Sequence, residues 1–465
     1  MIPLSLDEIA AATGGEVHGG AGIVVTADAC MDSRAVAHGG LFVAVAGERV
    51  DGHEYAGAAH AAGAAAILAT RPTSAPTVVV ADAVTALGRL ARHVLDQLPD
   101  VQVLAVTGSQ GKTGTKDYLA AVLAGAGPTV ATAGNFNNEI GLPLTVLRAD
   151  AETAYLVVEM GARRIGDLAH LCAIAPPDVA AVVNVGTAHI GEFGSREAIA
   201  QAKGEIVEAL TPEGTAVLGA DDPVVLAMAA RTRGRVLTFG RDGDVSWRGT
   251  SADDLGRPTF ELGHAGQWHP VSLAQLGAHQ LVNAAAAATM ALAVGVPLAG
   301  VAVSLSAARP GSRWRMEVHE RVDGVLVIND AYNANPASME AAINTLGAIG
   351  RRGRRTVAVL GEMRELGGEA ERAHVLVGMA AAMAGIDVIV AVGPMANAFA
   401  QGATRHFGWT GQVVATAGRD EALDWVRNNV LVGDVVLVKA SRGVALEHVA
   451  DGLLDAGPGR GEEGD

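Results

Sequence analysis

The sequence predicts an α/β protein with three domains, and three observations support this class. The chain has 465 residues, and a prior of about 150 residues per domain gives about three domains. Short apolar runs of strand length alternate with helical stretches, as in parallel sheets covered by helices. Half of the residues are hydrophobic but only 3% are aromatic, so the cores must consist mainly of Ala, Val, Leu and Ile.

The first domain is expected at residues 1–98 and the second at residues 99–312. The first mixes short strands with Ala-rich helices, as in "GGLFVAVAGERVDGHEYAGAAHAAGAAAIL", which predicts a small α/β domain. The second contains βα repeats. Its apolar runs are typical of parallel strands buried on both faces, and they lie at 155–158, 179–183 and 216–218. Gly, Trp and Asp in residues 245–275 indicate a hairpin region.

The third domain, residues 313–465, is expected to be a second doubly wound, Rossmann-like unit. Its strands are expected at 325–328, 356–360, 388–392, 413–415 and 435–438. The final residues, "GPGRGEEGD", combine glycine, proline and charge without any large apolar side chain. We therefore expect a disordered tail.

Composition and charge exclude several classes of protein. The formal net charge of −16 argues against nucleic-acid binding, which needs a basic surface. Cys30 and Cys172 cannot form a framework of several disulfides, and the N-terminus lacks the basic region of a signal peptide. The longest run without charged residues, 270–308, is rich in alanine, and we expect two buried helices there rather than a membrane span. We expect a cytoplasmic monomer.

The stretch "VLAVTGSQGKTGTKDYLAAVL" predicts a phosphate-binding loop between a strand and a helix. The strict pattern G-x-x-x-x-G-K-[ST] fails, because Val106 stands where the first glycine belongs. The physical requirements are met, since the glycines let N–H groups turn toward an anion, Lys112 supplies charge and Thr113 offers a hydroxyl to Mg²⁺. An ordinary glycine-rich turn is the alternative. The ATP-binding residues expected here are Thr107, Gly108, Ser109, Gln110, Gly111, Lys112 and Thr113.

Polar residues interrupt the apolar runs at their carboxyl ends. These residues are Thr107, Glu159, Asn184, Asp330, Glu362 and Lys439. Ligands of open α/β sheets bind at that edge, so we expect two functional edges that face one cleft. Glu159 is either a solvated strand end or a Mg²⁺ carboxylate, and the nearby phosphate loop favours the metal. His189 taken alone would be a surface or capping residue.

Lys203 lies at an unusual place in the helix predicted for residues 195–210, which begins with Ser195 as N-cap. At about 100° per residue, Lys203 falls in the middle of the apolar face, whereas Glu205 falls on the polar side. A lysine that snorkels to an edge is the alternative. An inward ammonium would oppose Mg²⁺, which suggests carbamylation by CO₂ to an anionic metal ligand, provided that burial lowers the pKa of the amine.

Three further polar segments lie in predicted loops or at helix starts. They are "TAGNFNNEIGLPLTVL", which contains Asn137 and Asn138, "GAHQLVNAAAAA", which contains Asn283, and "NDAYNANPASME", which contains Asp330, Tyr332 and Asn333. Asparagine favours turns, so ordinary loops are the alternative. Asn amides also bind phosphate and substrate oxygens without adding charge.

Taken together, these motifs resemble the Mur ligase family over nearly the full length of the chain. The matching stretches are "DSRAVAHGGLFVAVAGERVDGHEY", "TGSQGKTGTK", "GNFNNEIGLP", "VEMGA", "NVGTAHIGEFGS", "AKGEI", "GAHQLVNAAAA", "SRWRMEV", "INDAYNANPASM", "LGEMRELG" and "KASRGVALE". The resemblance implies an N-terminal domain that binds a UDP-MurNAc-peptide, a central P-loop-type ATPase domain and a C-terminal Rossmann-like ligase domain.

The resemblance also implies a reaction. ATP, with Mg²⁺, would phosphorylate the terminal carboxylate of UDP-MurNAc-tripeptide, and the amine of D-Ala-D-Ala would attack the acyl phosphate to form an amide in peptidoglycan precursor synthesis. "GNFNNEIG" and "DAYNANPASM" point to this member of the family. The alternatives are a family member that adds another amino acid, a ligase similar to folylpolyglutamate synthase, and a nucleotide-dependent switch. "GERVDGH" argues against the folate enzyme, which typically lacks that first domain.

Carried over by resemblance, the residues take the following roles. Lys112 holds the β/γ-phosphates, while Thr113, Glu159, His189 and a carbamylated Lys203 hold metal. Asn283 matches the adenine contact, Asp330 the ribose-side acid, and Arg315 the arginine that reaches the transferred phosphate, with Arg313 as an open alternative. The residues expected to bind the nucleotide peptide or the acceptor are Ser33, Arg34, Arg49, Asp51, His53, Asn137, Asn138, Tyr332 and Asn333. Gln110 and Glu362 depart from the family's usual residues.

Overall fold

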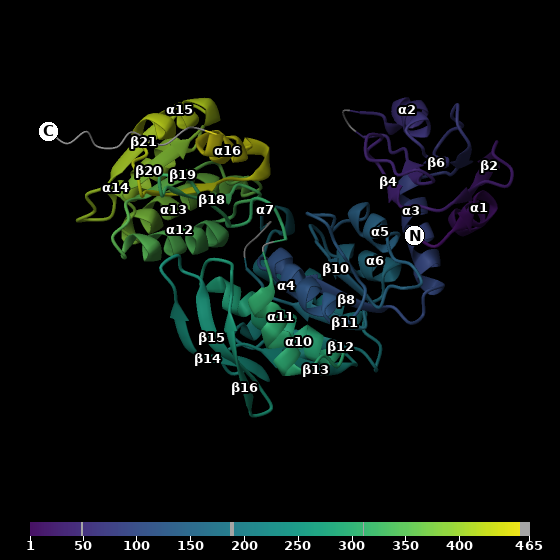
Figure 1. Ribbon diagram of the computed structural model, residues 1–465, viewed down its shortest axis with the longest axis horizontal. Coiled ribbons are helices and arrows are strands. Elements are labelled where there is room, and N and C mark those ends of the chain that lie inside the picture. The colour runs from purple at the N-terminus through teal and green to yellow at the C-terminus, as the bar shows by residue number, and fades with distance from the viewer. Residues whose placement is uncertain (48–49, 187–189, 310, 456–465) are drawn as a thin grey trace.

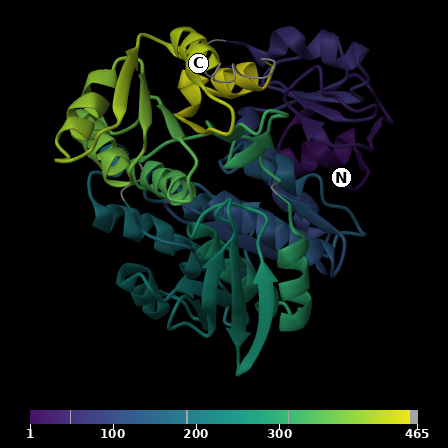
Figure 2. The ribbon, with the colours of Figure 1, turned by 60° about the vertical axis from the view of Figure 1, so that its left-hand side comes forward.

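The computed structural model describes residues 1–47, 50–186, 190–309 and 311–455, and four sheets organise them (Figure 1). The central sheet has nine strands, and the N-terminal and C-terminal sheets lie on different sides of it in both views (Figures 1 and 2). The α/β class and the three-domain architecture predicted from the sequence are confirmed. No helix within the described ranges is long and apolar enough to cross a membrane.

The N-terminal part is built on a five-stranded sheet in the order β2-β7-β6-β5-β4. Its strands are β2 (Glu16–His18), β4 (Ala29–Cys30), β5 (Leu41–Val43), β6 (Ala66–Ala69) and β7 (Thr77–Val79), and β1 (Leu4–Ser5) pairs separately with β3 (Val24–Val25). The helices are α1 (Leu6–Thr13), η1 (Gly52–Tyr55), α2 (Ala56–Ala61) and α3 (Ala83–Asp96). Helix α1 begins with a capping box between Ser5 and Glu8. Helix α3 shares one apolar core with the middle part of the chain, which fixes the two together.

The middle part contains the sheet β16-β15-β14-β13-β12-β11-β8-β10-β9. The strands are β8 (Gln102–Thr107), β9 (Thr129–Ala131), β10 (Tyr155–Glu159), β11 (Val179–Val182), β12 (Thr215–Gly219), β13 (Arg235–Phe239), β14 (Val245–Ala252), β15 (Pro258–His264) and β16 (Gln267–Ser272). Strands β8 to β13 are parallel, whereas β14, β15 and β16 pair antiparallel. The hairpin region expected at residues 245–275 is confirmed.

Helices cover both faces of this sheet. They are α4 (Lys112–Ala124), α5 (Gly141–Val146), α6 (Asp167–Ile174), α7 (Ile190–Phe193), α8 (Arg196–Glu208), α9 (Pro223–Leu226), η2 (Ala227–Arg231), α10 (His279–Ala293) and α11 (Leu298–Ala307). The charge-free run contains α10 and α11, as predicted. All of Ala284–Ala288 are buried in α10, because small side chains let this helix lie close to α4 and the sheet.

The C-terminal part has a six-stranded sheet in the order β17-β18-β22-β19-β20-β21, parallel except for the edge strand β17. Its strands are β17 (Glu317–Glu320), β18 (Leu326–Asp330), β19 (Thr356–Leu360), β20 (Val388–Val392), β21 (Gln412–Thr416) and β22 (Val435–Lys439). Its helices are α12 (Pro336–Gly350), η3 (Gly367–Glu369), α13 (Ala370–Met383), α14 (Ala396–Thr404), α15 (Arg419–Asn429), η4 (Arg442–Val444) and α16 (Glu447–Asp455). The tail for which disorder is predicted, 457–465, lies outside the described residues.

Polar residues lie at the carboxyl ends of the parallel strands, as expected from the sequence. Thr107 and Glu159 are the last residues of the neighbouring strands β8 and β10. Asp330 and Lys439 end β18 and β22 and are direct cross-strand partners. Parallel strands bring their carboxyl ends to one edge of a sheet, so each sheet presents a cluster of polar side chains at that edge.

Candidate active site

A cleft of about 990 Å³ lies between the edges of the central and C-terminal sheets. It brings together most of the residues predicted for the site. Those that line it are Ser109, Gln110, Gly111, Lys112, Thr113, Asn137, Asn138, Glu159, Lys203, Asn283, Arg315, Asp330, Tyr332 and Asn333. The two sheet edges therefore face one common space, as expected.

Eight other predicted residues lie elsewhere or outside the described chain. Thr107 and Gly108 belong to the phosphate loop but do not line the cleft, and the buried Thr107 hydroxyl has no hydrogen-bond partner among the described residues. His189 and Arg49 lie outside the described residues. His53 belongs to the N-terminal part, as do the other predicted residues of that part.

The phosphate loop is shaped by glycine. Gly111 has a left-handed φ of 79° and forms the N-cap of α4, a conformation that residues with a Cβ rarely adopt. A Cβ on Gly111 would also lie 2.5 Å from Asn283 Oδ1. Lys112 Nζ donates to the Gly108 carbonyl over 2.7 Å, and Gln110 N–H donates to Asn184 Oδ1 over 3.0 Å. The loop thus places the start of α4, with its free N–H groups, beside the N-terminal turns of α10.

Oxygen ligands gather beside this loop. The Thr113 hydroxyl donates to Glu159 Oε2 over 2.8 Å, and Asn137 Nδ2 donates to Glu159 Oε1 over 2.7 Å. Glu159 is almost fully buried, and its N–H donates to the Thr132 hydroxyl. A hydroxyl and a carboxylate held this close together suit a hard cation. Among the described residues, no group of three or more His, Cys, Asp or Glu forms a metal cluster, so this set is not a complete protein cage.

Lys203 points into the protein, as its place on the helix predicts. Its side chain lines the cleft and only 4% of the residue is exposed. Burial lowers the pKa of Lys203 well below its ordinary value, and the nearby Lys112 ammonium lowers it further. Ser195 begins α8 as the expected N-cap, since its hydroxyl accepts from Ala198 N–H. The lowered pKa of Lys203 makes the neutral amine more accessible there than on a solvent-exposed lysine.

The polar face predicted for this helix is wrong in one position. Glu205 was expected toward solvent but is buried. Its Oε1 accepts from Gly166 N–H over 2.6 Å and its Oε2 accepts from Ala169 N–H over 3.0 Å. The free N–H groups at the start of α6 attract a carboxylate, and this contact overrides the amphipathic pattern.

The C-terminal domain contributes one arginine to the phosphate side of the cleft. Arg315 lines the cleft, and its guanidinium carbon lies 4.2 Å from the centre of the Tyr332 ring. Lys112 has a lowered pKa chiefly because of burial; the Glu159 carboxylate opposes this shift and the Arg315 charge adds to it. Arg313 lies over the ring of Trp314 instead and does not line the cleft. Of the two arginines, Arg315 thus faces the phosphate loop.

Asp330 is held in place by a residue that the sequence prediction left out of the site. Lys439 Nζ donates to Asp330 Oδ2 over 2.7 Å and to the Asn333 carbonyl over 2.8 Å. Lys439 is itself buried and lines the cleft. From the sequence, Lys439 was expected only as a polar residue at a strand end, and that position was the signal that could have placed it in the site. Other cleft residues that the prediction missed include Arg163, Gln275, Gln280, Ser338 and Arg442. Gln280, Ser338 and Arg442 lie within stretches that match the family, whereas Arg163 and Gln275 lie outside them.

The start of α10 forms the wall opposite the C-terminal helix α12. Asn283 Nδ2 donates to Gln280 Oε1 over 3.0 Å, and both residues are buried. Burial lowers the pKa of His279, an effect that the Asp330 carboxylate opposes and the Lys439 ammonium reinforces, so a neutral imidazole is favoured. Uncharged polar groups in an enclosed wall suit a nucleobase edge.

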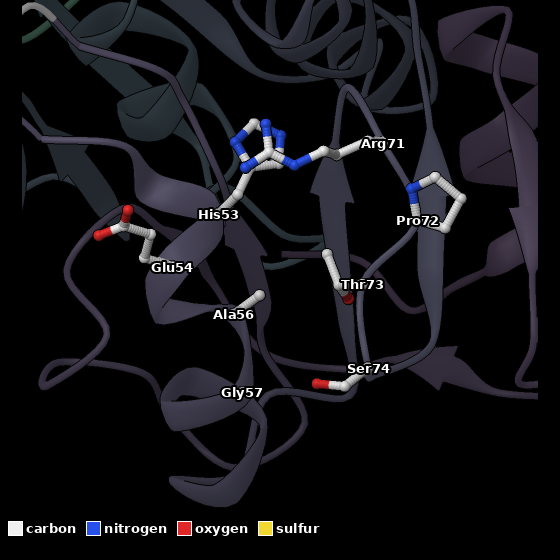
Figure 3. A pocket seen from close by; sticks show the side chains of 8 residues that line it. All are labelled: His53, Glu54, Ala56, Gly57, Arg71, Pro72, Thr73 and Ser74. Carbon is white, nitrogen blue, oxygen red and sulfur yellow. The ribbon is translucent and has the colours of Figure 1, made fainter.

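The N-terminal part contains a smaller pocket of about 280 Å³, and His53 is the predicted residue that lines it (Figure 3). Figure 3 shows the Arg71 guanidinium beside the His53 ring. His53 Nδ1 lies 2.5 Å from Asp51 Oδ1, and His53 Nε2 accepts from Thr70 N–H over 3.1 Å. Arg71 Nη2 donates to Asp51 Oδ2 over 2.8 Å. Both ring nitrogens of His53 are engaged within the domain, so His53 shapes this loop.

Ser33 and Arg34 lie on the same domain, outside both pockets. Arg34 forms a bidentate contact with Asp32, through Nε to Oδ1 at 2.9 Å and Nη2 to Oδ2 at 2.7 Å. These hydrogen bonds lower the pKa of Asp32 to about 2. The pair is exposed and holds the turn after β4 in place.

Family models match three successive parts of the chain. They are the Mur ligase family catalytic domain at residues 29–98, the Mur ligase middle domain at residues 106–291 and the Mur ligase glutamate ligase domain at residues 314–442. Together they cover most of the chain.

Individual proteins are similar over almost the full length. The UDP-N-acetylmuramoyl-tripeptide--D-alanyl-D-alanine ligase of Mycobacterium tuberculosis (strain ATCC 25618 / H37Rv) is 44% identical, with 98% of each chain covered. A crystal structure of MurF from Acinetobacter baumannii has a TM-score of 0.87 at 32% identity and covers 98% of this chain and 99% of its own. MurF ligase from Thermotoga maritima in complex with ADP has a TM-score of 0.79 at 33% identity, with 93% and 98% covered. The chain belongs to the Mur ligase family.

Proposed function

We propose that this chain is an ATP-dependent ligase that joins D-alanyl-D-alanine to UDP-N-acetylmuramoyl-tripeptide through an acyl phosphate. The observation that carries this proposal is the single cleft into which the phosphate loop and Glu159 project from one side, and Arg315 and Asp330 from the other. The Mycobacterium tuberculosis relative described above is named for this reaction, and its similarity extends over nearly the whole chain. The product belongs to peptidoglycan precursor synthesis.

The chemistry explains why such a site needs concentrated positive charge. A carboxylate is a poor acyl donor, so its oxygen first attacks the γ-phosphorus of ATP and ADP leaves. The amine of the dipeptide then attacks the acyl carbon, phosphate leaves and a proton is lost from nitrogen. The first step brings two anions together, and fixed cations stabilise the charge that develops. We assign this role to Lys112 and Arg315, since both line the cleft and the Arg315 charge acts on Lys112.

Binding roles divide between the two sides of the cleft. We assign the phosphates to the loop of residues 107–113, the adenine to Asn283 and the ribose to Asp330. The substrates would contact Asn137, Asn138, Tyr332 and Asn333, all of which line the cleft. On the N-terminal domain, Ser33, Arg34, Arg49, Asp51 and His53 are assigned to the uridine nucleotide, with His53 acting through the loop that it holds.

Mg²⁺ fits the oxygen ligands beside the phosphate loop. Thr113 and Glu159 would hold one ion, since their side-chain oxygens already lie 2.8 Å apart, and we assign His189 and Lys203 to metal binding as well. When bound, the ion supplies positive charge to the phosphate oxygens. The protein holds these oxygens at the carboxyl end of β10, where the phosphates of ATP would lie.

Lys203 would join this set after carbamylation. The buried, neutral amine would bond the carbon of CO₂ and lose a proton, which gives an anion with two oxygens. Burial and the neighbouring Lys112 charge both favour the neutral amine that this step needs. The modification would place negative charge beside the metal, where an ammonium group would oppose it.

The domain boundaries fit this division of roles. We propose that residues 1–98 bind the nucleotide peptide, residues 99–312 bind ATP, and residues 313–465 complete the ligase site. We further propose that the protein acts in the cytoplasm as a monomer, because its substrates are a soluble nucleotide and a dipeptide and because one chain supplies both sides of the cleft.

Phosphate release from ATP tests the proposal. Release should require both UDP-MurNAc-tripeptide and D-Ala-D-Ala, and mass spectrometry should identify the amide product. Replacement of D-Ala-D-Ala by single amino acids should abolish release, which separates this activity from that of other amino-acid-adding ligases. Rapid hydrolysis with ATP alone would contradict the proposal and favour a nucleotide-dependent switch.

A further inference from the structure

The segment Arg313–Met316 has an unusual backbone on both sides of Arg315. Trp314 has a φ of 58° and Met316 a φ of 51°. This left-handed region is unfavourable for residues that carry a Cβ, and such residues keep it only where their surroundings enforce it. Two such residues flank Arg315, which lines the cleft and whose charge acts on Lys112, so the strain surrounds a residue of the cleft.

Three backbone contacts hold this segment. Trp314 N–H donates to Glu317 Oε2 over 2.9 Å, and the Trp314 carbonyl accepts from Tyr332 N–H over 3.1 Å. Met316 N–H donates to Asp330 Oδ1 over 3.1 Å. The peptide groups before and after Arg315 are thus fixed to the end of β18.

The indole of Trp314 provides a further anchor through its ring. The guanidinium carbon of Arg442 lies 4.4 Å from the ring centre, and that of Arg313 lies 5.3 Å away. Both distances are within the range of cation–π attraction. The indole Nε1 is buried and has no hydrogen-bond partner among the described residues. Stacking rather than the indole N–H therefore retains Trp314.

The side chain of Arg315 depends on these anchors for its direction. Met316 is buried in the C-terminal core, so anchored residues stand on both sides of Arg315. Its guanidinium rests over the Tyr332 ring at 4.2 Å and its charge reaches Lys112. A long side chain that is fixed before the substrate arrives is preorganised for the charge that develops during phosphoryl transfer.

We propose that Trp314 is a positioning residue for Arg315: its stacked indole keeps the backbone left-handed and so aims the Arg315 guanidinium at the transferred phosphate. This inference rests on the ligase function proposed above. It assigns to Trp314 a role in the rate of phosphoryl transfer, without any contact between Trp314 and the substrates.

The test compares three variants in the phosphate-release assay with both substrates. Trp314→Gly and Trp314→Ala remove the indole and should lower kcat by on the order of tenfold to a hundredfold, with little change in KM for ATP. Trp314→Phe keeps an aromatic face and should retain kcat within about threefold. The control is Trp268→Ala, since Trp268 also carries a stacked arginine, Arg248 at 4.1 Å, but lies on β16 away from the cleft. It should leave kcat unchanged.

A double-mutant cycle connects the effect to Arg315. Arg315→Ala should lower kcat much less in the Trp314→Gly background than in the native protein, because Arg315 is no longer held there. Independent, multiplying effects would overturn the inference, as would a native kcat in Trp314→Gly. A native protein that fails to couple phosphate release to both substrates would instead overturn the proposed function, and this inference with it.

Thermal unfolding tests the backbone premise without any enzyme assay. Trp314→Gly should unfold at a higher temperature than Trp314→Ala, because the backbone hydrogen bonds of residue 314 remain and favour a φ near 58°, which glycine tolerates and alanine does not. Equal unfolding temperatures would show that residue 314 is not held left-handed, and would overturn the inference.

Discussion

At the scale of single residues, the cleft combines several cations with one buried carboxylate. Lys112, Lys203 and Arg315 line it, and Glu159 is the acidic partner that opposes the lowered pKa of Lys112. Burial is the main reason that the pKa values of both lysines are lowered; the Arg315 charge lowers that of Lys112 further, and the Lys112 charge lowers that of Lys203 further. Bound ATP would add negative charge to the cleft, and Mg²⁺ would add positive charge. The roles of Lys112 and Lys203 can be tested separately by substitution.

Replacement of Lys203 should remove most activity in a way that small acids can reverse. Lys203→Ala deletes the proposed carbamate, and short carboxylic acids such as formate should restore part of kcat by placing two oxygens in the emptied space. Lys203→Arg should not be rescued, because its guanidinium stays charged and fills the space. Phosphate release at increasing acid concentrations measures the rescue.

A second buried lysine provides the matched control for this rescue. Lys116 donates to the Thr132 carbonyl over 2.8 Å and does not line the cleft. Any activity lost in Lys116→Ala should not return with formate. Full activity of Lys203→Ala without added acid, or rescue of both variants alike, would refute the carbamate.

The two arginines of the 313–315 segment should differ in their effects. Arg315→Ala removes a charge that faces the phosphate loop, and the loss of one such contact typically lowers kcat by on the order of 10²–10³. Arg313→Ala should lower kcat by no more than about tenfold, since its guanidinium lies over the Trp314 ring and does not line the cleft. Steady-state rates under saturating substrates distinguish them, and a larger effect of Arg313→Ala would reverse the assignment.

The sequence predicted much of the cleft but not its internal partners. Strand ends and the apolar face of one helix were enough to predict Glu159, Asp330 and Lys203 as cleft residues. The contact of Lys439 with Asp330 and the choice of Arg315 over Arg313 depend on cross-strand register and on left-handed backbone. Such features are set by tertiary packing rather than by local pattern, so the sequence could not provide them.

At the scale of elements, helix α8 is held from both sides of Lys203. Glu205 caps the start of α6. Behind the helix, Arg231 donates to the Ala200 carbonyl over 3.1 Å, to the Gln201 carbonyl over 2.9 Å and to Glu208 Oε1 over 2.8 Å. These contacts fix the rotation of α8 and therefore the inward direction of Lys203.

Gly204 leaves the space that the Arg231 guanidinium occupies. A Cβ on Gly204 would lie 1.8 Å from Arg231 Nη1. Gly204→Ala should therefore displace Arg231 and destabilise the fold by about 1–3 kcal/mol, the usual value for lost hydrogen bonds to a charged group. It should also lower kcat, because α8 carries Lys203. Urea unfolding and phosphate release measure the two effects.

Two controls separate this mechanism from a general effect of alanine. Gly300 lies in α11 with no atom within 4 Å of its added Cβ, so Gly300→Ala should be neutral or stabilise by up to about 1 kcal/mol. In an Arg231→Ala background, Gly204→Ala should lose its destabilising effect. Persistence of the full effect there would show that Arg231 is not the cause.

Element positions follow closely from apolar runs, and the differences have physical causes. The strand expected at 388–392 is β20 without change, and the helix expected at 195–210 ends two residues earlier as α8. Strands β1 and β3 have two residues each, which is too short for a periodic pattern. Their pairing depends on contacts across the fold.

At the scale of the whole molecule, the described residues of the middle and C-terminal domains touch at places that include the following two. At the turn between β14 and β15, Arg352 Nη1 donates to Asp254 Oδ1 over 2.6 Å. In the same turn, Leu255 packs against the C-terminal core. Across the cleft, Arg163 Nη2 lies 3.5 Å from Glu365 Oε1. The apolar contact is suited to a fixed pivot, whereas exposed ion pairs are weak and can open. The sequence could not predict this arrangement, because the paired residues are far apart in the chain.

This arrangement predicts that the domains close on their ligands. ATP contacts are assigned to Lys112 and Asn283 on one side and to Arg315 and Asp330 on the other, so neither side forms the site alone. Small-angle scattering should show a smaller radius of gyration when an ATP analogue and the nucleotide peptide are both bound. Arg315→Ala is the matched control, since it removes a contact from the C-terminal side and should reduce the change. Calorimetry confirms saturation, and an unchanged radius of gyration in the saturated native protein would contradict closure.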